Sequence, residues 1–204
     1  MTTFFLIRHA SCSGLGRTLW GRTPGISLNQ KGRLQAQRLA DRFRDIKLHS
    51  IHSSPLERAV ETAEMIARAK NLEIKNNPEF HEINFGEWTG KSFEVLSSDE
   101  CWRRFNGRRS ATRVPGGESF VEVQTRIVRE LDALSLEYGS ANIAIVSHAD
   151  VIKAAVGYFS ATPIDMLHRF EISPCSVSVI AMDNESARLL TINNRCELDQ
   201  LWSD

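Results

Sequence analysis

The feature that most constrains the fold is a pair of histidines, each placed just after a short apolar run. Phe4–Ile7 leads directly into Arg8 and His9, and Ile143–Val146 leads within two residues to His148. Apolar runs of this length, bounded by polar residues, predict buried strands. Because ligands bind at the carboxyl ends of strands in open α/β sheets, we expect two parallel strands to present both imidazoles to one crevice.

Length and charge limit what the chain can be. Its 204 residues suffice for one domain with a sizeable core, and 42% hydrophobic with 25% charged residues is typical of a globular protein. The 25 basic and 25 acidic residues give a formal net charge of zero. A nucleic-acid or anionic-membrane binder would need a basic excess, so we expect neither partner, and any recognition of an anion must be local.

Neither a disulfide framework nor a metal site is expected. The cysteines are scattered, without a Cys-x-x-Cys pair: Cys12, Cys101, Cys175 and Cys196. His49 and His52 are three positions apart, but no further ligands complete a zinc site around them. The cysteine pattern, together with the lack of a signal peptide or a membrane-length apolar run, favours a cytoplasmic location.

Hydrophobic periodicity and turn residues predict alternating strands and helices. Helices are expected at about 29–44, from Pro55 to about 67, at 120–138 and at 149–158, with a short turn or helix at 163–167. Strands are expected at 48–53 and 72–75, and 176–182 should pair with 188–193 as a hairpin at one side of the sheet. Ser54 is expected to cap the second helix, and Ser119 with Glu122 forms a capping-box pattern.

This order predicts the fold class. We expect one α/β domain over residues 1–204, a three-layer sandwich with a mostly parallel central sheet and helices on both faces. Residues 91–117 are expected to form a small helical insertion over the active site. The insertion contains five arginines, which form either a solvated face or a basic rim toward the substrate: Arg103, Arg104, Arg108, Arg109 and Arg113. The last eight residues, with Trp202, give no clear signal.

An irregular, glycine-rich loop at residues 10–28 follows the first predicted strand. It carries Arg17, Trp20 and Arg22, which lie beside the predicted crevice. Each of these side chains, taken singly, is more simply explained as surface charge or as a ring packed on the body of the protein. Arg22 is nevertheless a candidate for binding the substrate.

Four motifs in order carry a resemblance to a known family. They are Arg8-His9, then Arg58 within Ser-Ser-Pro-Leu-x-Arg-Ala, then Glu82 ahead of Phe-Gly-Glu-Trp, and last Ser147-His148. Their order resembles that of the histidine phosphatase superfamily, which includes the cofactor-dependent phosphoglycerate mutases, and the resemblance covers roughly residues 4 to 160. The family usually has glycine after the first histidine and an asparagine a few residues later. Here Ala10 and Leu15 stand at those places.

The resemblance implies a role for each group, and elementary chemistry agrees with it. Arg8 and Arg58 would hold the non-bridging oxygens of a phosphate, because a guanidinium group is always charged and donates two parallel hydrogen bonds to such oxygens. His9 would be the nucleophile, His148 would bind one more phosphate oxygen and stabilise the transferring group, and Glu82 would serve as general acid and then general base. Arg22 and Ala149 are the further substrate-binding candidates. No metal or cofactor is needed, because the cations are side chains.

Three functions remain open on the sequence alone. The first is a metal-independent phosphatase that hydrolyses phosphate monoesters of small metabolites through a phosphohistidine on His9. Pro115-Gly116-Gly117-Glu118-Ser119 resembles the branch of broad-specificity and α-ribazole-phosphate phosphatases. The second is a phosphoglycerate mutase, which returns the phosphoryl group to a sugar acid. The third is a non-catalytic binder of a phosphorylated ligand. The partner would be a small phosphorylated metabolite, and a homodimer is possible.

Overall fold

A six-stranded, mostly parallel sheet forms the centre of the protein in a computed structural model that describes residues 1–195. The strand order is β3-β2-β4-β1-β5-β6. The neighbours from β3 to β1 pair in parallel, whereas β5 pairs antiparallel with both β1 and β6. The strands are β1 (Thr2–Arg8), β2 (Ser50–Ser53), β3 (Ile74–Asn76), β4 (Asn142–Ser147), β5 (Val177–Met182) and β6 (Ala187–Asn194). The predicted mostly parallel α/β sheet is therefore confirmed, with the C-terminal hairpin at one edge.

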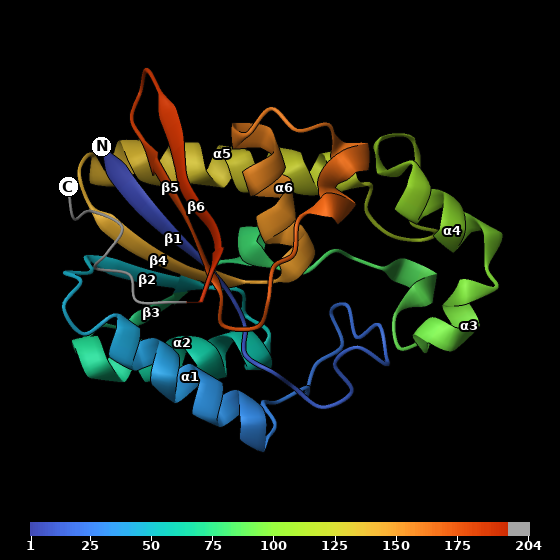
Figure 1. The fold of residues 1–204 in the computed structure, drawn as a ribbon, viewed down its shortest axis with the longest axis horizontal. Helices are drawn as coiled ribbons and strands as arrows, with labels where there is room; N and C mark the ends of the chain where they lie inside the picture. Colours follow the sequence, from blue (N-terminus) through green and yellow to red (C-terminus); the bar gives the residue numbers. More distant parts are fainter. Residues whose placement is uncertain (196–204) are drawn as a thin grey trace.

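Helices cover both faces of this sheet, because its central strands are apolar on both sides. Phe5 and Ile7 of β1 pack toward the helices α1 and α2, while Phe4 and Leu6 pack toward α5 and α6. Figure 1 shows the two helix pairs on opposite sides of the strands. The helices are α1 (Gln30–Arg42), α2 (Glu57–Lys70), α5 (Phe120–Tyr138) and α6 (Ala149–Phe159). Two cores separated by one sheet give the three layers that were predicted.

The predicted caps at two helix starts are confirmed. The side chain of Asn29 accepts a hydrogen bond from the Gly32 amide at 2.8 Å, which begins α1. Ser119 and Glu122 form a reciprocal capping box at the start of α5. Each cap satisfies amides that a helix leaves without a partner, so residues adjacent in sequence determine where these helices begin.

The second helix begins later than predicted. Leu56 is its N-cap, and α2 starts at Glu57, so neither Ser54 nor Pro55 belongs to the helix. The hydroxyl of Ser54 instead lies 2.8 Å from Nε2 of His148. The prediction of Ser54 as a helix cap was therefore wrong, because a long-range polar partner competes for the hydroxyl that a local capping rule assigns to the helix.

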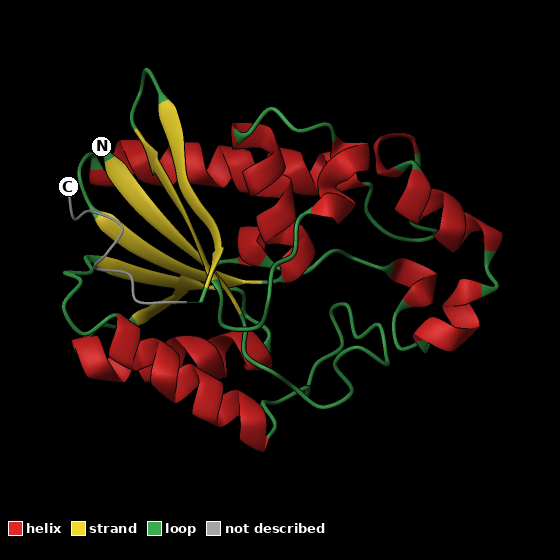
Figure 2. Cartoon of the chain, viewed as in Figure 1, coloured by secondary structure: helices red, strands yellow, loops and turns green. Residues whose placement is uncertain are grey.

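The remaining elements are short. The expected insertion contains α3 (Phe93–Ser97), α4 (Glu100–Gly107) and the 3₁₀ helix η3 (Arg109–Ala111), and η4 (Ile164–Arg169) follows α6. The loop expected at 78–90 includes η1 (Pro78–Phe80) and η2 (Gly86–Trp88). Figure 2 shows the long irregular segment between β1 and α1 next to the insertion. Trp202 and Cys196 lie outside the described residues. No helix among residues 1–195 is long and apolar enough to cross a membrane.

Candidate active site

The pairing of β1 with β4 brings the two histidines together. The strands are parallel neighbours, and their register places Arg8 beside Ser147. The residues that follow are His9 and His148, and the amide of His9 donates to the carbonyl of Ser147 at 2.9 Å. The two ring centroids lie 5.2 Å apart. The strand ends therefore bring the two imidazoles side by side, as the sequence predicts, but only His9 lines the cavity, whereas His148 is completely buried.

The tautomer of His9 follows from one hydrogen bond. Its Nδ1 lies 2.7 Å from the carbonyl oxygen of Ala10. A carbonyl can only accept, so Nδ1 carries the proton and Nε2 keeps its lone pair. Burial, followed by the charges of Arg58 and Arg8, holds the pKa of His9 well below its ordinary value. The ring is therefore neutral near pH 7 and has one nitrogen free to attack.

Two guanidinium groups beside His9 retain unpaired donors. Arg58 is 3% exposed, and its Nη2 donates to the Gly21 carbonyl at 2.7 Å. Arg8 donates from Nη1 to the Ile172 carbonyl at 2.6 Å. Within residues 1–195, Nη1 of Arg58 and Nε of Arg8 are buried without a hydrogen-bond partner. Because a buried donor without an acceptor is costly, this arrangement favours the binding of an anion beside His9.

The ring of His148 is held in place by a hydrogen bond with Ser54. Nε2 of His148 lies 2.8 Å from the Ser54 hydroxyl, which can donate or accept and so can follow either tautomer of the ring. Nδ1 of His148 lies 3.4 Å from Nη2 of Arg58, and the ring is completely buried and does not line the cavity. Burial, and next the charge of Arg58, lowers the pKa of His148 well below its ordinary value. Ser54 thus fixes the ring plane, and Nδ1 lies on the side of Arg58 and Glu82.

Glu82 also lines the cavity, and it lies in a loop rather than at the end of a strand. Its Oε2 lies 3.9 Å from Nδ1 of His148, and its Oε1 accepts from the Ile83 amide at 2.9 Å. Burial, together with the negative charge of Asp150, raises the pKa of Glu82 to about 7. A carboxyl group that titrates near neutral pH can both give and take a proton under the same conditions.

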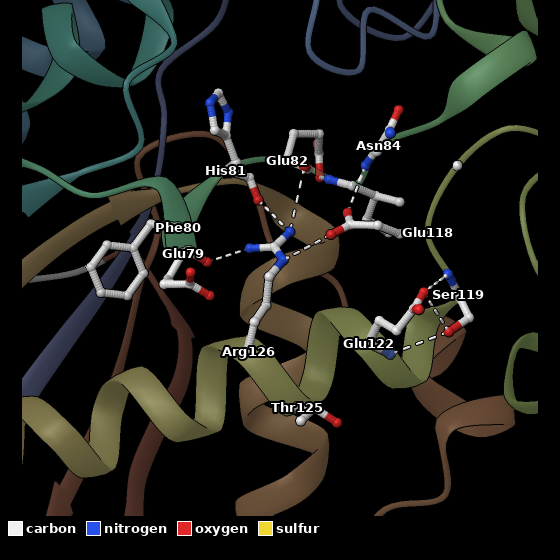
Figure 3. A network of polar contacts seen from close by, with 12 residues as sticks. Glu79, Phe80, His81, Glu82, Asn84, Glu118, Ser119, Glu122, Thr125 and Arg126 are labelled. Atoms are coloured by element: carbon white, nitrogen blue, oxygen red, sulfur yellow. Dashed lines mark hydrogen bonds and ion pairs between the residues drawn. The ribbon is translucent and has the colours of Figure 1, made fainter.

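A partly buried ion pair holds the loop that carries Glu82. Arg126 on α5 donates to the backbone carbonyls of Glu79 and His81, the second at 2.7 Å, and its Nε lies 3.2 Å from the carboxylate of Glu118. That carboxylate also accepts from the Asn84 amide at 2.7 Å. Figure 3 shows Arg126 reaching from its helix into this loop. These contacts fix the backbone before Glu82, at Glu79 and His81, and after it, at Asn84. Arg126 is therefore a positioning residue for the carboxyl group of Glu82.

Replacing Arg126 with methionine is expected to lower kcat by about 10- to 100-fold, because a small displacement of a reacting group is that costly. Esters with poor leaving groups should lose more than 4-nitrophenyl phosphate, since only they depend fully on Glu82. The control is Arg113→Met, which removes an exposed arginine paired with Glu122. Equal losses in the two variants, or a loss in thermal stability alone, would contradict the positioning role.

Of the two further substrate-binding candidates, Ala149 lines the cavity and Arg22 does not. Ala149 lines the cavity as the first residue of α6, so its amide is one that no helix carbonyl accepts. Arg22 does not line the cavity: it donates to the Glu82 carbonyl at 2.8 Å and to the Glu118 carboxylate at 2.9 Å. Its contacts are those of a second positioning residue, and direct substrate binding by Arg22 stays a prediction.

The insertion does not supply a basic rim. None of its five arginines lines the cavity that the described residues form. Arg109 is buried, lies over the rings of Phe105 and Phe120, and pairs with Asp150 at 2.8 Å. Arg113 pairs with Glu122. Only Phe93 of the insertion reaches the cavity wall. The idea of a substrate-facing rim was wrong for these arginines, because packing and ion pairing within the fold occupy Arg109 and Arg113.

Three site residues escaped the sequence analysis. Asp150 lines the cavity two positions after His148, and that closeness in sequence could have revealed it. Arg126 and Glu118 act through long-range contacts that no local pattern encodes. Among residues 1–195, no group of three or more histidine, cysteine or acidic side chains is placed to hold a metal ion.

The fold and the site together define a class: an α/β protein in which a strand end and a helix start place Arg8, His9 and Arg58 at one cavity, with a second, buried histidine next to His9. Residues 4–195 match the histidine phosphatase superfamily, branch 1, and the chain belongs to that family. Phosphoserine phosphatase 1 of Hydrogenobacter thermophilus is 29% identical over 210 residues, which cover 99% of this chain and 97% of that protein.

A second relative and a solved structure extend the comparison. A probable phosphoglycerate mutase GpmB of Erwinia tasmaniensis is 32% identical over 188 residues, covering 87% of this chain and 84% of that protein. Among solved structures, Bacillus stearothermophilus YhfR has a TM-score of 0.89 and 27% identity, covering 97% of this chain and 99% of that one. Membership therefore supports phosphatase or mutase-type activity and leaves the substrate open.

Proposed function

We propose that the protein is a phosphatase that hydrolyses phosphate monoesters of small metabolites through a phosphohistidine on His9, without a metal. The observation that carries the proposal is the state of the His9 ring. Its Nδ1 is bound to the Ala10 carbonyl, and its free Nε2 lies in a cavity with unpaired guanidinium donors. A neutral nucleophile beside two fixed cations is suited to attack on an anionic phosphoryl group.

The first half-reaction forms the phosphoenzyme. Nε2 of His9 attacks phosphorus, and the bond from phosphorus to the ester oxygen breaks. Glu82, protonated at the start, gives its proton to the departing alkoxide, which leaves as the alcohol. Arg8, Arg58 and Nδ1 of His148 hold the non-bridging oxygens as charge develops on them.

The second half-reaction restores the enzyme. The ionised carboxylate of Glu82 takes a proton from water, and the resulting hydroxide oxygen bonds to phosphorus while the bond to Nε2 of His9 breaks. Inorganic phosphate leaves, and His9 and Glu82 return to their starting protonation states. A pKa of about 7 suits Glu82 to both steps.

A mutase would use the same phosphoenzyme, and the 32% identity to a probable phosphoglycerate mutase keeps that alternative in view. A non-catalytic binder would have no use for a proton donor such as Glu82. Hydrolysis of α-ribazole phosphate is one specific case within the phosphatase proposal. A cytoplasmic location and a homodimer stay predictions.

The test is a screen of phosphorylated metabolites and 4-nitrophenyl phosphate with the purified protein, with and without 2,3-bisphosphoglycerate. We expect release of inorganic phosphate without that compound, unchanged by a chelator and inhibited by vanadate, which mimics the five-coordinate transition state. Interconversion of phosphoglycerates without hydrolysis would establish the mutase instead. Loss of activity in the chelator would point to a metal-dependent reaction and overturn the proposal.

A further inference from the structure

The cavity is larger than a phosphoryl group requires. Its volume is about 440 Å³, within the range of roughly 300–1,000 Å³ typical of sites for small organic molecules. Arg8, His9 and Arg58 lie at the phosphate end together with Glu82. The space beyond them must hold the alcohol part of the ester, so the side chains lining that space bear on which substrates are accepted.

Apolar side chains line most of this remaining space. They are Leu15, Leu19, Trp20, Phe85, Phe93 and Pro174. Leu15 and Trp20 are only half-buried, and Phe93 is 36% exposed, so each has surface left to bury against a ligand. Burying that surface against a nonpolar group is favourable, whereas a polar group would lose hydration without compensation.

The ring of Trp20 is held in place and offers no polar atom. Its Nε1 donates to the Ser13 carbonyl at 2.7 Å, which uses the only donor of the indole. The ring packs on Gly14, where an added Cβ would lie 2.8 Å from Nε1. Gly14 also has a φ of +71°, so glycine is favoured there for two reasons. A rigid aromatic face beside the phosphate end suits a flat or aliphatic group.

The lining of the cavity offers no further cation to a second anion. Arg8 and Arg58 are the only cations among the described residues that line it, and the proposed reaction uses both to hold the dianionic phosphoryl group. Asp150 lines the same cavity with a carboxylate that Arg109 keeps ionised. Arg17 lies in an adjoining hollow, together with Glu94. A substrate carboxylate close to the phosphate would therefore lose its hydration against apolar walls and be repelled by the carboxylate of Asp150.

We propose that the site selects phosphate monoesters whose alcohol part is apolar or aromatic and carries no second anionic group. This inference rests on the proposed phosphatase function. It separates the protein from enzymes that act on phosphoserine or phosphoglycerate, whose substrates each bring a carboxylate within a few bonds of the phosphate.

Two matched esters test it: 4-methylphenyl phosphate and 4-carboxyphenyl phosphate. They have similar size and shape and differ in one charge, and the carboxylated phenol is the better leaving group. Chemistry alone would therefore favour the carboxylated ester. We expect kcat/KM to favour the methyl ester by at least about 10-fold, mostly through KM, because the unfavourable contact exists in the ground state as well as the transition state. Phosphoserine and 3-phosphoglycerate should be poorer still.

A variant pair locates the effect. Leu15→Lys places a cation on the cavity wall and is expected to shift the preference toward 4-carboxyphenyl phosphate by at least about 10-fold. Leu15→Met adds length without charge and should keep the preference for the methyl ester. Equal or better turnover of the carboxylated ester or of phosphoserine by the unaltered protein would overturn the inference and leave the phosphatase in place. Failure to hydrolyse any ester would instead refute the proposed function, and the inference with it.

Discussion

Alanine in place of His9 should reduce hydrolysis of 4-nitrophenyl phosphate by on the order of 10⁴-fold or more, because loss of a covalent nucleophile removes the pathway rather than tuning it. The fold should survive, since the ring contributes one backbone hydrogen bond, to Ala10, and a contact with His148. The measurements are steady-state turnover, thermal unfolding and covalent labelling from a phosphorylated substrate. The label should be present in the unaltered protein and absent from the variant.

His168→Ala is the matched control, because His168 is exposed and lies outside the residues that line the cavity. It should keep both turnover and labelling. Retention of a covalent phosphate in His9→Ala would show that another residue is the nucleophile. Equal losses of activity in the two variants would mean that the effect of His9→Ala is not specific to the site.

Glutamine at position 82 is the second substitution with a large expected effect. It keeps the shape of the side chain and removes the acidic proton, so alkyl phosphates should slow by about 10²- to 10⁴-fold, the usual contribution of a general acid or base. For 4-nitrophenyl phosphate the first step needs little help from an acid. A burst of 4-nitrophenol should therefore precede slow turnover, because water attack on the phosphoenzyme still lacks its base.

The pH profile distinguishes a proton-transfer role of Glu82 from a purely structural one. The pKa of about 7 means that the group is protonated below neutral pH and ionised above it. For esters with poor leaving groups, kcat should fall as pH rises through that region, because the acid is lost. Because the pKa of His9 is lowered, the nucleophile is already neutral in this pH range. We therefore assign the fall in kcat to the ionisation of Glu82. Glu82→Gln should remove the limb, whereas exposed Glu87→Gln should retain it. A limb that persists in Glu82→Gln would assign the proton donor elsewhere.

Much of the fold could be predicted because local rules and tertiary contacts agree over long stretches. Asn29 caps α1 and Ser119 begins α5 as expected, since each cap joins residues three positions apart. The prediction failed at Ser54, whose hydroxyl is hydrogen-bonded to a histidine 94 positions away instead of capping α2. It failed again at Arg109, which is buried against aromatic rings and an aspartate instead of forming a solvated face or a rim.

The residues of the candidate site also fall into two groups: those that a local sequence pattern predicts and those that depend on long-range contacts. His9 and His148 could be predicted because each follows a strand, and strand-end positions are visible in the sequence. Arg126 could not, because its importance depends on the backbone carbonyls of a loop that folds against its helix. The contact of Arg22 with the backbone of Glu82 could not be predicted for the same reason, and substrate binding by Arg22 stays a prediction.

The sequence alone determined which reactive groups exist, their order, and the layered α/β arrangement, because hydrophobic periodicity and strand ends are local properties. Only the tertiary structure decided the distances between those groups and their protonation. The register of β1 against β4 places one ring 5.2 Å from the other, and burial beside Asp150 raises the pKa of Glu82. Both effects arise between residues far apart in the chain, where distance and dielectric environment depend on the completed packing.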